Sequence, residues 1–141
     1  MHDKIIRKKN INTIRVRYAE TDAMGLVYNS EYLVYFEVAR GELMRSIGYP
    51  YSEFEKAGYV LPLVEAHVNF KTPAHYDDLL EIHAQLIFEM KATLRIEYNI
   101  FRGNTTIAEG YTVHSFLNKN LNKPVKPPKI FVDKISAKSN D

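Results

Sequence analysis

The chain has 141 residues, 45% of them hydrophobic and 26% charged, and its formal net charge is +2. This length fits a single domain, residues 1–141, and the near-balanced charge predicts no nucleic-acid partner, which would need a concentrated basic stripe. The absence of cysteine excludes disulfides, thiolate zinc sites and cysteine nucleophiles, and the one excess is ten tyrosines, a residue type common at binding surfaces.

The N-terminal segment carries charges but no apolar stretch of signal-peptide length, and nothing in the chain approaches the roughly 20 apolar residues of a membrane span. We therefore expect a cytoplasmic protein with no membrane insertion. The first predicted strand follows, because Ile14, Val16 and Tyr18 alternate with Arg15 and Arg17.

From residue 30 to about residue 47 the spacing becomes that of an amphipathic helix. Apolar residues recur there at intervals of three and four, at Tyr32, Tyr35, Phe36, Ala39, Leu43 and Ile47. Asn29 or Ser30 can cap the start of the helix, and Gly48 followed by Pro50 suits its end.

Strands account for most of the chain beyond a short helical turn expected over residues 52–56. Alternation of apolar and polar residues predicts four strands, over residues 64–70, 80–88, 94–100 and 105–117. Gly103-Asn104 is typical of a tight hairpin turn, and the short links predict an antiparallel meander. The tail, about residues 119–141, is rich in lysine and proline, and we expect it to hug the surface or to be flexible.

A single long helix among these strands has only the sheet against which to bury its apolar face. We therefore expect an α+β fold in which an antiparallel sheet wraps around one long central helix, with its core over about residues 11–118. Such a sheet leaves exposed edges and one poorly covered face. Pairing with further subunits resolves this, so we expect a homodimer or a homotetramer.

The segment from Tyr18 to Asn29 is the part of the chain best suited to chemistry. It is an acidic loop before a helix start, and Gly25 permits sharp backbone geometry. The N-terminus of a helix presents unpaired N–H groups and a positive dipole end. The carboxylate of Asp22 could therefore act as nucleophile or base while an N–H group polarises a carbonyl. The alternative is structural: Asp22 caps a turn and complements the dipole.

Residues 17–37 read RYAETDAMGLVYNSEYLVYFE, and residues 68–82 read VNFKTPAHYDDLLEI. Both stretches resemble the hotdog-fold acyl-CoA thioesterases. The first is most similar to the 4-hydroxybenzoyl-CoA thioesterase type and to its relatives encoded beside the Tol–Pal system. The resemblance covers roughly residues 11–118 in strand order. It implies a hotdog fold and an enzyme that hydrolyses an acyl-CoA to a carboxylic acid and free coenzyme A.

The resemblance assigns the catalytic carboxylate to Asp22, which either attacks the thioester carbonyl or activates water. It assigns the donor to that carbonyl to the backbone N–H of Asn29, a position where other members often have His or Tyr. Tyr18 takes a supporting role. We expect further substrate contacts from Gly25, Val27, Tyr28 and Tyr32. Coenzyme A is part of the substrate, so no metal and no other cofactor is implied.

Ordinary structural roles explain the remaining polar residues more simply. A separate hotdog branch uses a helical glutamate, but Glu31 complements the helix dipole and Glu37 should form an i+3 ion pair with Arg40. The histidines on or beside strands lack metal-ligand spacing, namely His67, His75, His83 and His114. Four basic residues could meet coenzyme A phosphates but are more simply solvated charges, namely Lys71, Lys91, Arg95 and Arg102.

Two alternatives stay open. An acyl-carrier-protein thioesterase would use the same site but would need a surface that matches an acidic carrier. A non-catalytic acyl-thioester binding protein would share the fold but needs no carboxylate at Asp22. Hydratase chemistry is disfavoured because Val27 and Asn29 occupy positions where a histidine would be needed, and serine-hydrolase chemistry because no Gly-x-Ser-x-Gly elbow exists.

Overall fold

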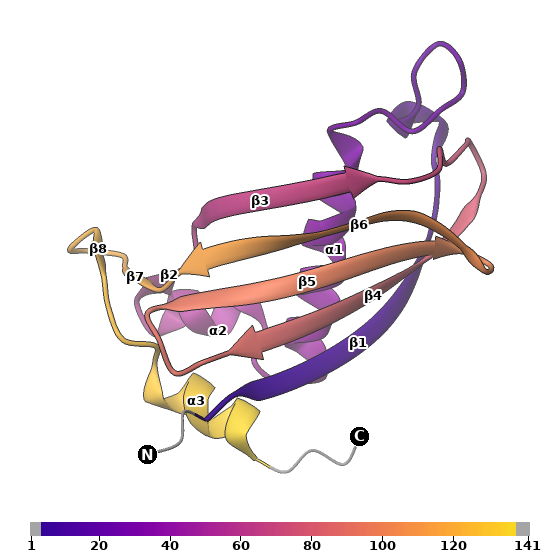
Figure 1. The fold of residues 1–141 in the computed structure, drawn as a ribbon. Coiled ribbons are helices and arrows are strands. Elements are labelled where there is room, and N and C mark those ends of the chain that lie inside the picture. Colours follow the sequence, from indigo (N-terminus) through magenta and orange to yellow (C-terminus); the bar gives the residue numbers. More distant parts are fainter. Residues whose placement is uncertain (1–3, 138–141) are drawn as a thin grey trace.

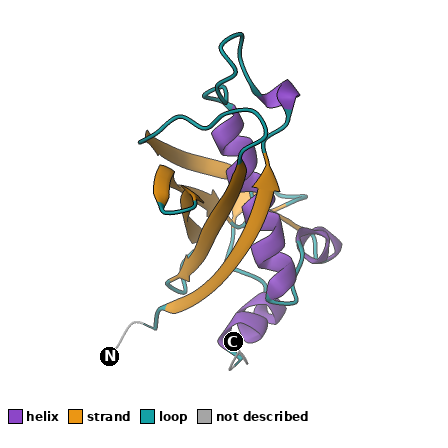
Figure 2. Cartoon of the chain, turned by 90° about the vertical axis from the view of Figure 1, so that its right-hand side faces the viewer, coloured by secondary structure: helices purple, strands orange, loops and turns teal. Residues whose placement is uncertain are grey.

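The structure, a computed structural model, describes residues 4–137 of the chain. Five strands form one antiparallel sheet, and a long helix, α1 (Glu31–Ser46), lies against one face of that sheet (Figure 1). The strand order is β1 (Ile6–Arg15), β4 (Leu79–Phe88), β5 (Thr93–Arg102), β6 (Thr105–Ser115) and β3 (Leu63–Phe70). Viewed from the side in Figure 2, the long strands curve around α1. The predicted α+β arrangement, a sheet wrapped around one central helix, is confirmed.

The meander of β4, β5 and β6 supplies the inner face of the sheet. Residues that alternate along β4 and β5 are fully buried against α1, among them Leu80, Ile82, Leu86, Ile96 and Ile100. The predicted turn at Gly103-Asn104 joins β5 to β6, and Gly103 has a φ of 58°, a left-handed conformation that glycine adopts without strain. The period-two pattern therefore predicted these three strands and their pairing correctly.

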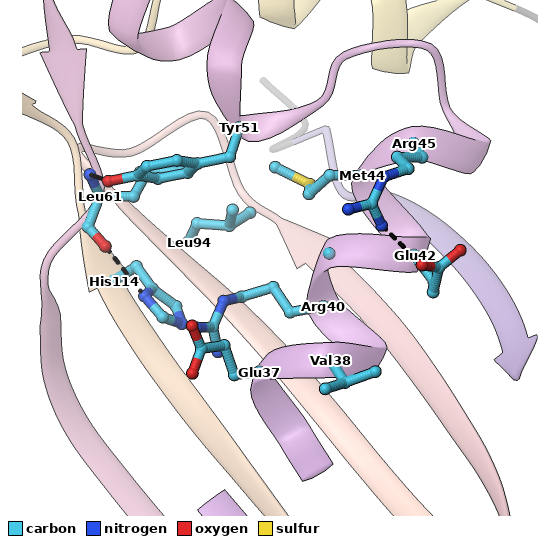
Figure 3. Close-up of a pocket in the computed structure, with 11 residues that line it drawn as sticks. Glu37, Val38, Arg40, Glu42, Met44, Arg45, Tyr51, Leu61, Leu94 and His114 are labelled. Atoms are coloured by element: carbon cyan, nitrogen blue, oxygen red, sulfur yellow. Dashed lines mark hydrogen bonds and ion pairs between the residues drawn. The ribbon is translucent and has the colours of Figure 1, made fainter. Parts of the chain in front are cut away.

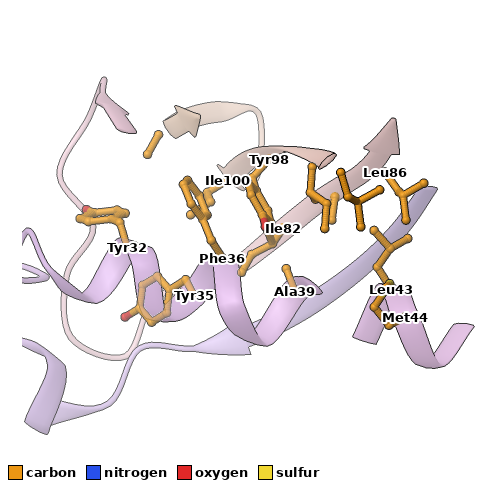
Figure 4. Packing of buried hydrophobic residues seen from close by; sticks show 14 of the residues in the cluster. Tyr32, Tyr35, Phe36, Ala39, Leu43, Met44, Ile82, Leu86, Tyr98 and Ile100 are labelled. Atoms are coloured by element: carbon orange, nitrogen blue, oxygen red, sulfur yellow. The ribbon is translucent and has the colours of Figure 1, made fainter. Parts of the chain in front are cut away.

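The centre of the core is a stack of two aromatic rings between α1 and the sheet (Figure 4). The ring of Phe36 lies face to face with that of Tyr98, with centroids 4.1 Å apart and planes 5° apart. Gly110 on β6 makes room for this stack, because a Cβ there would collide with the carbonyl oxygen of His67 and crowd the Phe36 ring. Glycine at this position is thus required by close packing rather than by backbone conformation.

The first strand begins earlier than the sequence indicates. β1 pairs with β4 along its whole length, from Ile6 opposite Phe88 to Arg15 opposite Leu79, so the predicted core boundary at about residue 11 is wrong. The burial pattern of β1 still alternates with period two, but three of its inner positions hold polar residues, namely Lys8, Asn10 and Asn12. Because these inner residues are polar, the sequence of β1 does not alternate between apolar and polar residues, and the pattern that predicts a strand is missing.

The tail is more ordered than predicted. Two short strands, β7 (Leu117–Asn118) and β8 (Lys123–Pro124), join β2 (Tyr59–Val60) in a small sheet, and α3 (Lys129–Ser136) follows. Phe131 and Ile135 of α3 are buried. Phe131 packs in an aromatic cluster with Tyr49, Phe54, Phe88 and Phe116, of which Phe54 belongs to α2 (Tyr51–Lys56). Of the two expectations for the tail, the flexible one is therefore wrong as far as residue 137, and the one that the tail hugs the surface agrees with the packing of α3. Residues 138–141 of the tail and residues 1–3 of the predicted domain lie outside the described residues.

No helix within residues 4–137 is both long enough and apolar enough to cross a membrane.

Candidate active site

The predicted site residues gather at the N-terminal end of α1, in the segment that connects β1 to this helix. A short 3-10 helix, η1 (Tyr18–Glu20), opens the segment. A miniature antiparallel ladder then folds the segment back on itself: Thr21 bridges Val27, and the N–H of Tyr28 donates to the carbonyl of Glu20 at 3.0 Å. The segment is also tied to the β3–β4 connection, because the N–H of Val27 donates to the carbonyl of Ala74 at 2.9 Å.

Asp22 lies in the exposed loop at the tip of this ladder. Its Oδ1 atom accepts hydrogen bonds from the backbone N–H groups of Met24 (2.8 Å) and Leu26 (3.1 Å). Gly25, with a φ of 77°, lets the loop turn tightly enough for both contacts. The structural role for Asp22 is therefore real. The other carboxylate oxygen, Oδ2, has no hydrogen-bond partner among residues 4–137. The two backbone contacts to Oδ1 therefore fix the carboxylate in place and leave Oδ2 available to act as a nucleophile or a base.

Asn29 lies at the second position of a turn that leads into α1. The N–H of Glu31 donates to the carbonyl of Tyr28 at 2.9 Å, and this contact closes the turn around Asn29 and Ser30. Ser30 precedes the helix but makes no side-chain cap. Within the described part of the chain the backbone N–H of Asn29 has no acceptor, and the residue is exposed. A free donor at the positive end of a helix is suited to bind a carbonyl oxygen.

The aromatic and apolar candidates divide into exposed and buried side chains. Tyr18 and Tyr28 are exposed, and the ring of Tyr18 meets that of Tyr76 edge to face at 5.7 Å. Val27 and Tyr32 are buried, and the ring of Tyr32 packs against Phe70 of β3. The structure therefore brings the two exposed rings to the surface beside the loop and places the other two side chains in the packing beneath it.

The sequence analysis did not single out Glu20, a buried carboxylate directly behind the loop. It accepts hydrogen bonds of 2.9 Å from the N–H of Arg17, from Nε of Arg17 and from the hydroxyl of Tyr35. Burial alone would raise the pKa of Glu20, but the hydrogen bonds from Arg17 and Tyr35 outweigh it and lower the pKa. Burial and this carboxylate together raise the pKa of Tyr35. The only signal in the sequence was the i+3 spacing of Arg17 and Glu20.

The β3–β4 connection beside the loop is held by a second ion pair. Arg102 donates to Oδ2 of Asp78 at 2.9 Å, and the N–H of His75 donates to the same atom at 2.8 Å. Burial would raise the pKa of Asp78, but the contacts with His75 and Arg102 lower it. The other basic residues considered for coenzyme A phosphates also contact carboxylates, as Lys71 with Glu109, Lys91 with Glu89 and Arg95 with Glu97. All four are engaged in ion pairs, as ordinary surface charges are.

A cavity of about 610 Å³ opens beside the second half of α1 (Figure 3). Glu37 and Arg40 both line it. The predicted ion pair between these two residues is wrong, because no side-chain nitrogen of Arg40 lies within 4.0 Å of a carboxylate oxygen of Glu37, whereas Arg45 pairs with Glu42 at 2.6 Å. Among residues 4–137, no group of three or more histidine, aspartate or glutamate side chains is placed to hold a metal ion.

Comparison with known proteins places the chain in a family. Residues 16–135 match the family described as the thioesterase-like superfamily. The chain belongs to this superfamily. A Bacillus subtilis protein, YneP, which is named as a candidate acyl-CoA thioesterase, is 35% identical over 122 residues, which are 85% of this chain and 88% of YneP.

Two solved structures are similar over nearly the whole chain. The crystal structure of a hypothetical protein from Aquifex aeolicus has 36% identity and a TM-score of 0.82, and the match covers 90% of this chain and 99% of that one. The DHNA-CoA thioesterase from Staphylococcus aureus has 28% identity and a TM-score of 0.83, with coverages of 89% and 85%. The predicted hotdog fold is confirmed, and the chain is a thioester hydrolase of that fold.

Proposed function

We propose that this thioester hydrolase acts on acyl-CoA and releases a carboxylic acid and free coenzyme A. The observation that carries the proposal is the pairing of a held carboxylate, Asp22, with a helix start at which the N–H of Asn29 has no acceptor among the described residues. The names of the relatives support the substrate class, because YneP is named as a candidate acyl-CoA thioesterase and the Staphylococcus aureus enzyme as a DHNA-CoA thioesterase.

In the proposed mechanism, the thioester carbonyl oxygen accepts a hydrogen bond from the N–H of Asn29. The positive end of the α1 dipole then stabilises negative charge that develops on this oxygen. On one route, Oδ2 of Asp22 attacks the carbonyl carbon, the C–S bond breaks, the coenzyme A thiolate takes up a proton, and water hydrolyses the resulting anhydride. On the other route, Asp22 removes a proton from the water that attacks the same carbon.

These two routes differ in the order of product release. A covalent anhydride lets coenzyme A leave before the acid forms, so rapid-quench kinetics should show a burst of free thiol ahead of the acid. General-base catalysis releases both products in the same step. The assignment of Tyr18 to a supporting role, and of Gly25, Val27, Tyr28 and Tyr32 to substrate contacts, belongs to the proposal.

The finer place of the chain within the superfamily is also proposed. The motif around Asp22 and Gly25 supports a 4-hydroxybenzoyl-CoA thioesterase type with Tol–Pal-associated relatives, and we propose that the enzyme works in the cytoplasm without a metal or redox cofactor. A test is the release of free thiol from a panel of aliphatic and aromatic acyl-CoAs, with the same acyl groups on acyl carrier protein for comparison. Hydrolysis of the carrier-bound set alone would make the carrier the substrate, and no hydrolysis at all would contradict the proposal.

We further propose that the working unit is a homodimer, or a homotetramer built from it, paired through β3. This strand contacts β6 on one side and no strand on its other side among the described residues, and it exposes apolar side chains, namely Leu63, Val64 and Phe70. α1 exposes Leu33 and Val38 as well. Antiparallel pairing of two β3 edges would cover these residues and complete the ladder of backbone hydrogen bonds.

This pairing has a consequence for the site. The loop around Asp22 lies near the C-terminal end of β3, where Tyr32 packs on Phe70, while the cavity beside Arg40 lies near the residues that precede β3, including Leu61. A twofold axis between the two paired β3 strands places the N-terminal end of β3 in one subunit beside the C-terminal end of β3 in the other. The cavity of one subunit would therefore face the Asp22 loop of its partner, and the acyl group would lie between the two helices.

A further inference from the structure

The cavity beside the second half of α1 has walls of two kinds (Figure 3). Apolar side chains on one part of its surface suit a hydrocarbon chain, namely Val38, Met44, Leu61 and Leu94. The polar part includes Arg40, which reaches from α1 toward the sheet, and His114, which is buried at the end of β6. These two residues are joined through the core by a chain of hydrogen bonds.

The donors and acceptors in this chain can be assigned from its last member. Nδ1 of His114 lies 3.2 Å from the carbonyl oxygen of Leu61, and a carbonyl only accepts, so Nδ1 carries the hydrogen. Burial, together with the charge of Arg40, lowers the pKa of His114 to about 4, which keeps the ring neutral. Nε2 must therefore accept, and it does so from the hydroxyl of Thr112 at 3.0 Å.

The remaining members then have fixed roles. Because the Thr112 hydroxyl donates to His114, it accepts from the hydroxyl of Tyr98, 2.7 Å away. The oxygen of Tyr98 in turn accepts from Nη1 of Arg40 at 3.3 Å. The hydroxyl hydrogens of Tyr98 and Thr112 and the Nδ1 hydrogen of His114 are thus all used in hydrogen bonds to protein groups. Among these four side chains, only Arg40 retains unused donors.

Arg40 is consequently a positioned cation that makes no ion pair in the described structure, although the carboxylate of Glu37 lines the same cavity. It is half-buried, one N–H anchors it to Tyr98, and no carboxylate lies within 4.0 Å of it in residues 4–137. Its neighbour on the cavity wall, Arg45, differs because Glu42 neutralises it. A half-buried guanidinium with free N–H groups favours an oxyanion, above all a carboxylate, which it can bind through two parallel hydrogen bonds.

We propose that this cavity binds the far end of the acyl group and that Arg40 binds a carboxylate there, so that preferred substrates are coenzyme A thioesters of dicarboxylic acids. The apolar wall accommodates the methylene groups between the two ends. The inference rests on the proposed acyl-CoA thioesterase function and specifies its substrate.

The test compares acyl-CoAs of equal chain length that end in a carboxylate or in a methyl group, with four to eight carbons. The wild-type enzyme should show a kcat/KM at least tenfold higher for the carboxylate-ended member of the best pair. R40M should lower this ratio at least tenfold, and R40K, which keeps the charge but loses the planar fork, should lower it less. R45M is the matched control, because Arg45 lines the same cavity but is already paired, and it should keep the wild-type ratio.

A binding measurement separates this inference from the proposed function. Calorimetry with coenzyme A thioethers, which cannot be hydrolysed, compares carboxylate-ended and methyl-ended chains without any turnover. Tighter binding of the carboxylate-ended thioether by wild type, lost in R40M, would support the cavity assignment even if no thioester were cleaved. Equal or tighter binding of the methyl-ended chain by wild type, or an unchanged ratio in both R40M and R40K, would overturn it. Dissociation of the oligomer by R40M with no change in the ratio would assign Arg40 to the subunit contact instead.

Discussion

The hydroxyl of Tyr35 on α1 donates a 2.9 Å hydrogen bond to the buried carboxylate of Glu20, which lies in the turn before the loop around Asp22. The backbone carbonyl of the same glutamate accepts from the N–H of Tyr28, immediately before Asn29. Glu20 thus links the core of the helix to Tyr28, and the next residue, Asn29, supplies the N–H group that is proposed to bind the thioester carbonyl. The geometry of the proposed donor depends on a contact buried beneath it.

Replacing Tyr35 by phenylalanine should therefore affect both stability and turnover. Y35F leaves the buried carboxylate of Glu20 with fewer donors, and we expect a loss of about 1–3 kcal/mol in the free energy of unfolding together with a several-fold lower kcat. Denaturant unfolding and thiol-release kinetics measure the two effects. Y59F is the control, because the half-buried hydroxyl of Tyr59 has no hydrogen-bond partner among residues 4–137. Equal kcat values for Y35F and wild type would disconnect this contact from the site.

Asp22 has a structural role and a proposed catalytic role, which a pair of substitutions can separate. Asparagine keeps an oxygen that can accept from Met24 and Leu26, so D22N should retain the loop, while D22A should lose both contacts. We expect D22N to lower kcat by about 10²–10⁴-fold with a melting temperature close to that of wild type. D22A should lower the melting temperature as well. Full activity of D22N would remove Asp22 from the mechanism.

The proposed role of the backbone N–H of Asn29 predicts opposite results for substitution by alanine and by proline. N29A keeps the N–H and should retain most of the activity, whereas N29P removes this donor and should lower kcat by about 10²–10³-fold. Proline fits the fold here, because Asn29 occupies the second position of the turn closed by Glu31 and Tyr28. Circular dichroism checks that N29P folds. A large loss in N29A would indicate that the side chain itself is required.

His114 should make stability depend on pH in a defined window. Its folded pKa of about 4 lies below the ordinary value of 6.5, so the folded protein binds fewer protons than the unfolded chain between these values. This contribution is complete above pH 6.5 and is lost as the pH falls toward 4, by roughly 3 kcal/mol in total. H114Q should lack this slope in urea unfolding between pH 7 and 4. Carboxylates with lowered pKa values, such as Glu20, also make stability depend on pH, but their contribution is lost only as the pH falls to about their ordinary value of 4.5 and below.

The proposed pairing through β3 can be tested by introducing charged residues at the two ends of this strand. A centred antiparallel pair of β3 strands would place Leu63 of one subunit opposite Phe70 of the other, since these residues end the strand. L63K/F70K sets like charges opposite each other and should reduce the mass measured by light scattering to that of one 16.4 kDa chain. L63K/F70E is the matched control and should restore association. A wild-type protein that is already monomeric at working concentration would refute the pairing.

The sequence predicted the parts of the fold in which local spacing and burial agree. The expected helix over residues 30–47 matches α1 within a residue at each end, and β4, β5 and β6 follow their period-two patterns. It failed for the first half of β1, whose inner face includes Lys8 and Asn10, and for α3. In α3 only two residues of a lysine-rich segment are buried, and the aromatic partners of Phe131 are far away in the sequence.

The candidate site divides in the same way. The loop around Asp22 and the start of α1 could be expected from residue types next to each other in the chain. The roles of Glu20 and Arg40 could not, because each depends on burial and on partners from other elements, such as Tyr35 and Tyr98. The i+3 spacing of Glu37 and Arg40 suggested an ion pair, but the tertiary hydrogen bond to Tyr98 draws Arg40 toward the sheet instead.

The aromatic cluster around Phe54, Phe116 and Phe131 lies at the C-terminal end of α1, whereas Asp22 lies beyond its N-terminal end. The 16 residues of the helix hold these two regions about 24 Å apart. Mutational effects at such a distance are usually additive. Directed evolution could therefore raise the heat tolerance of this enzyme by repacking the cluster and, separately, alter the reactions it accepts, with little trade-off between the two.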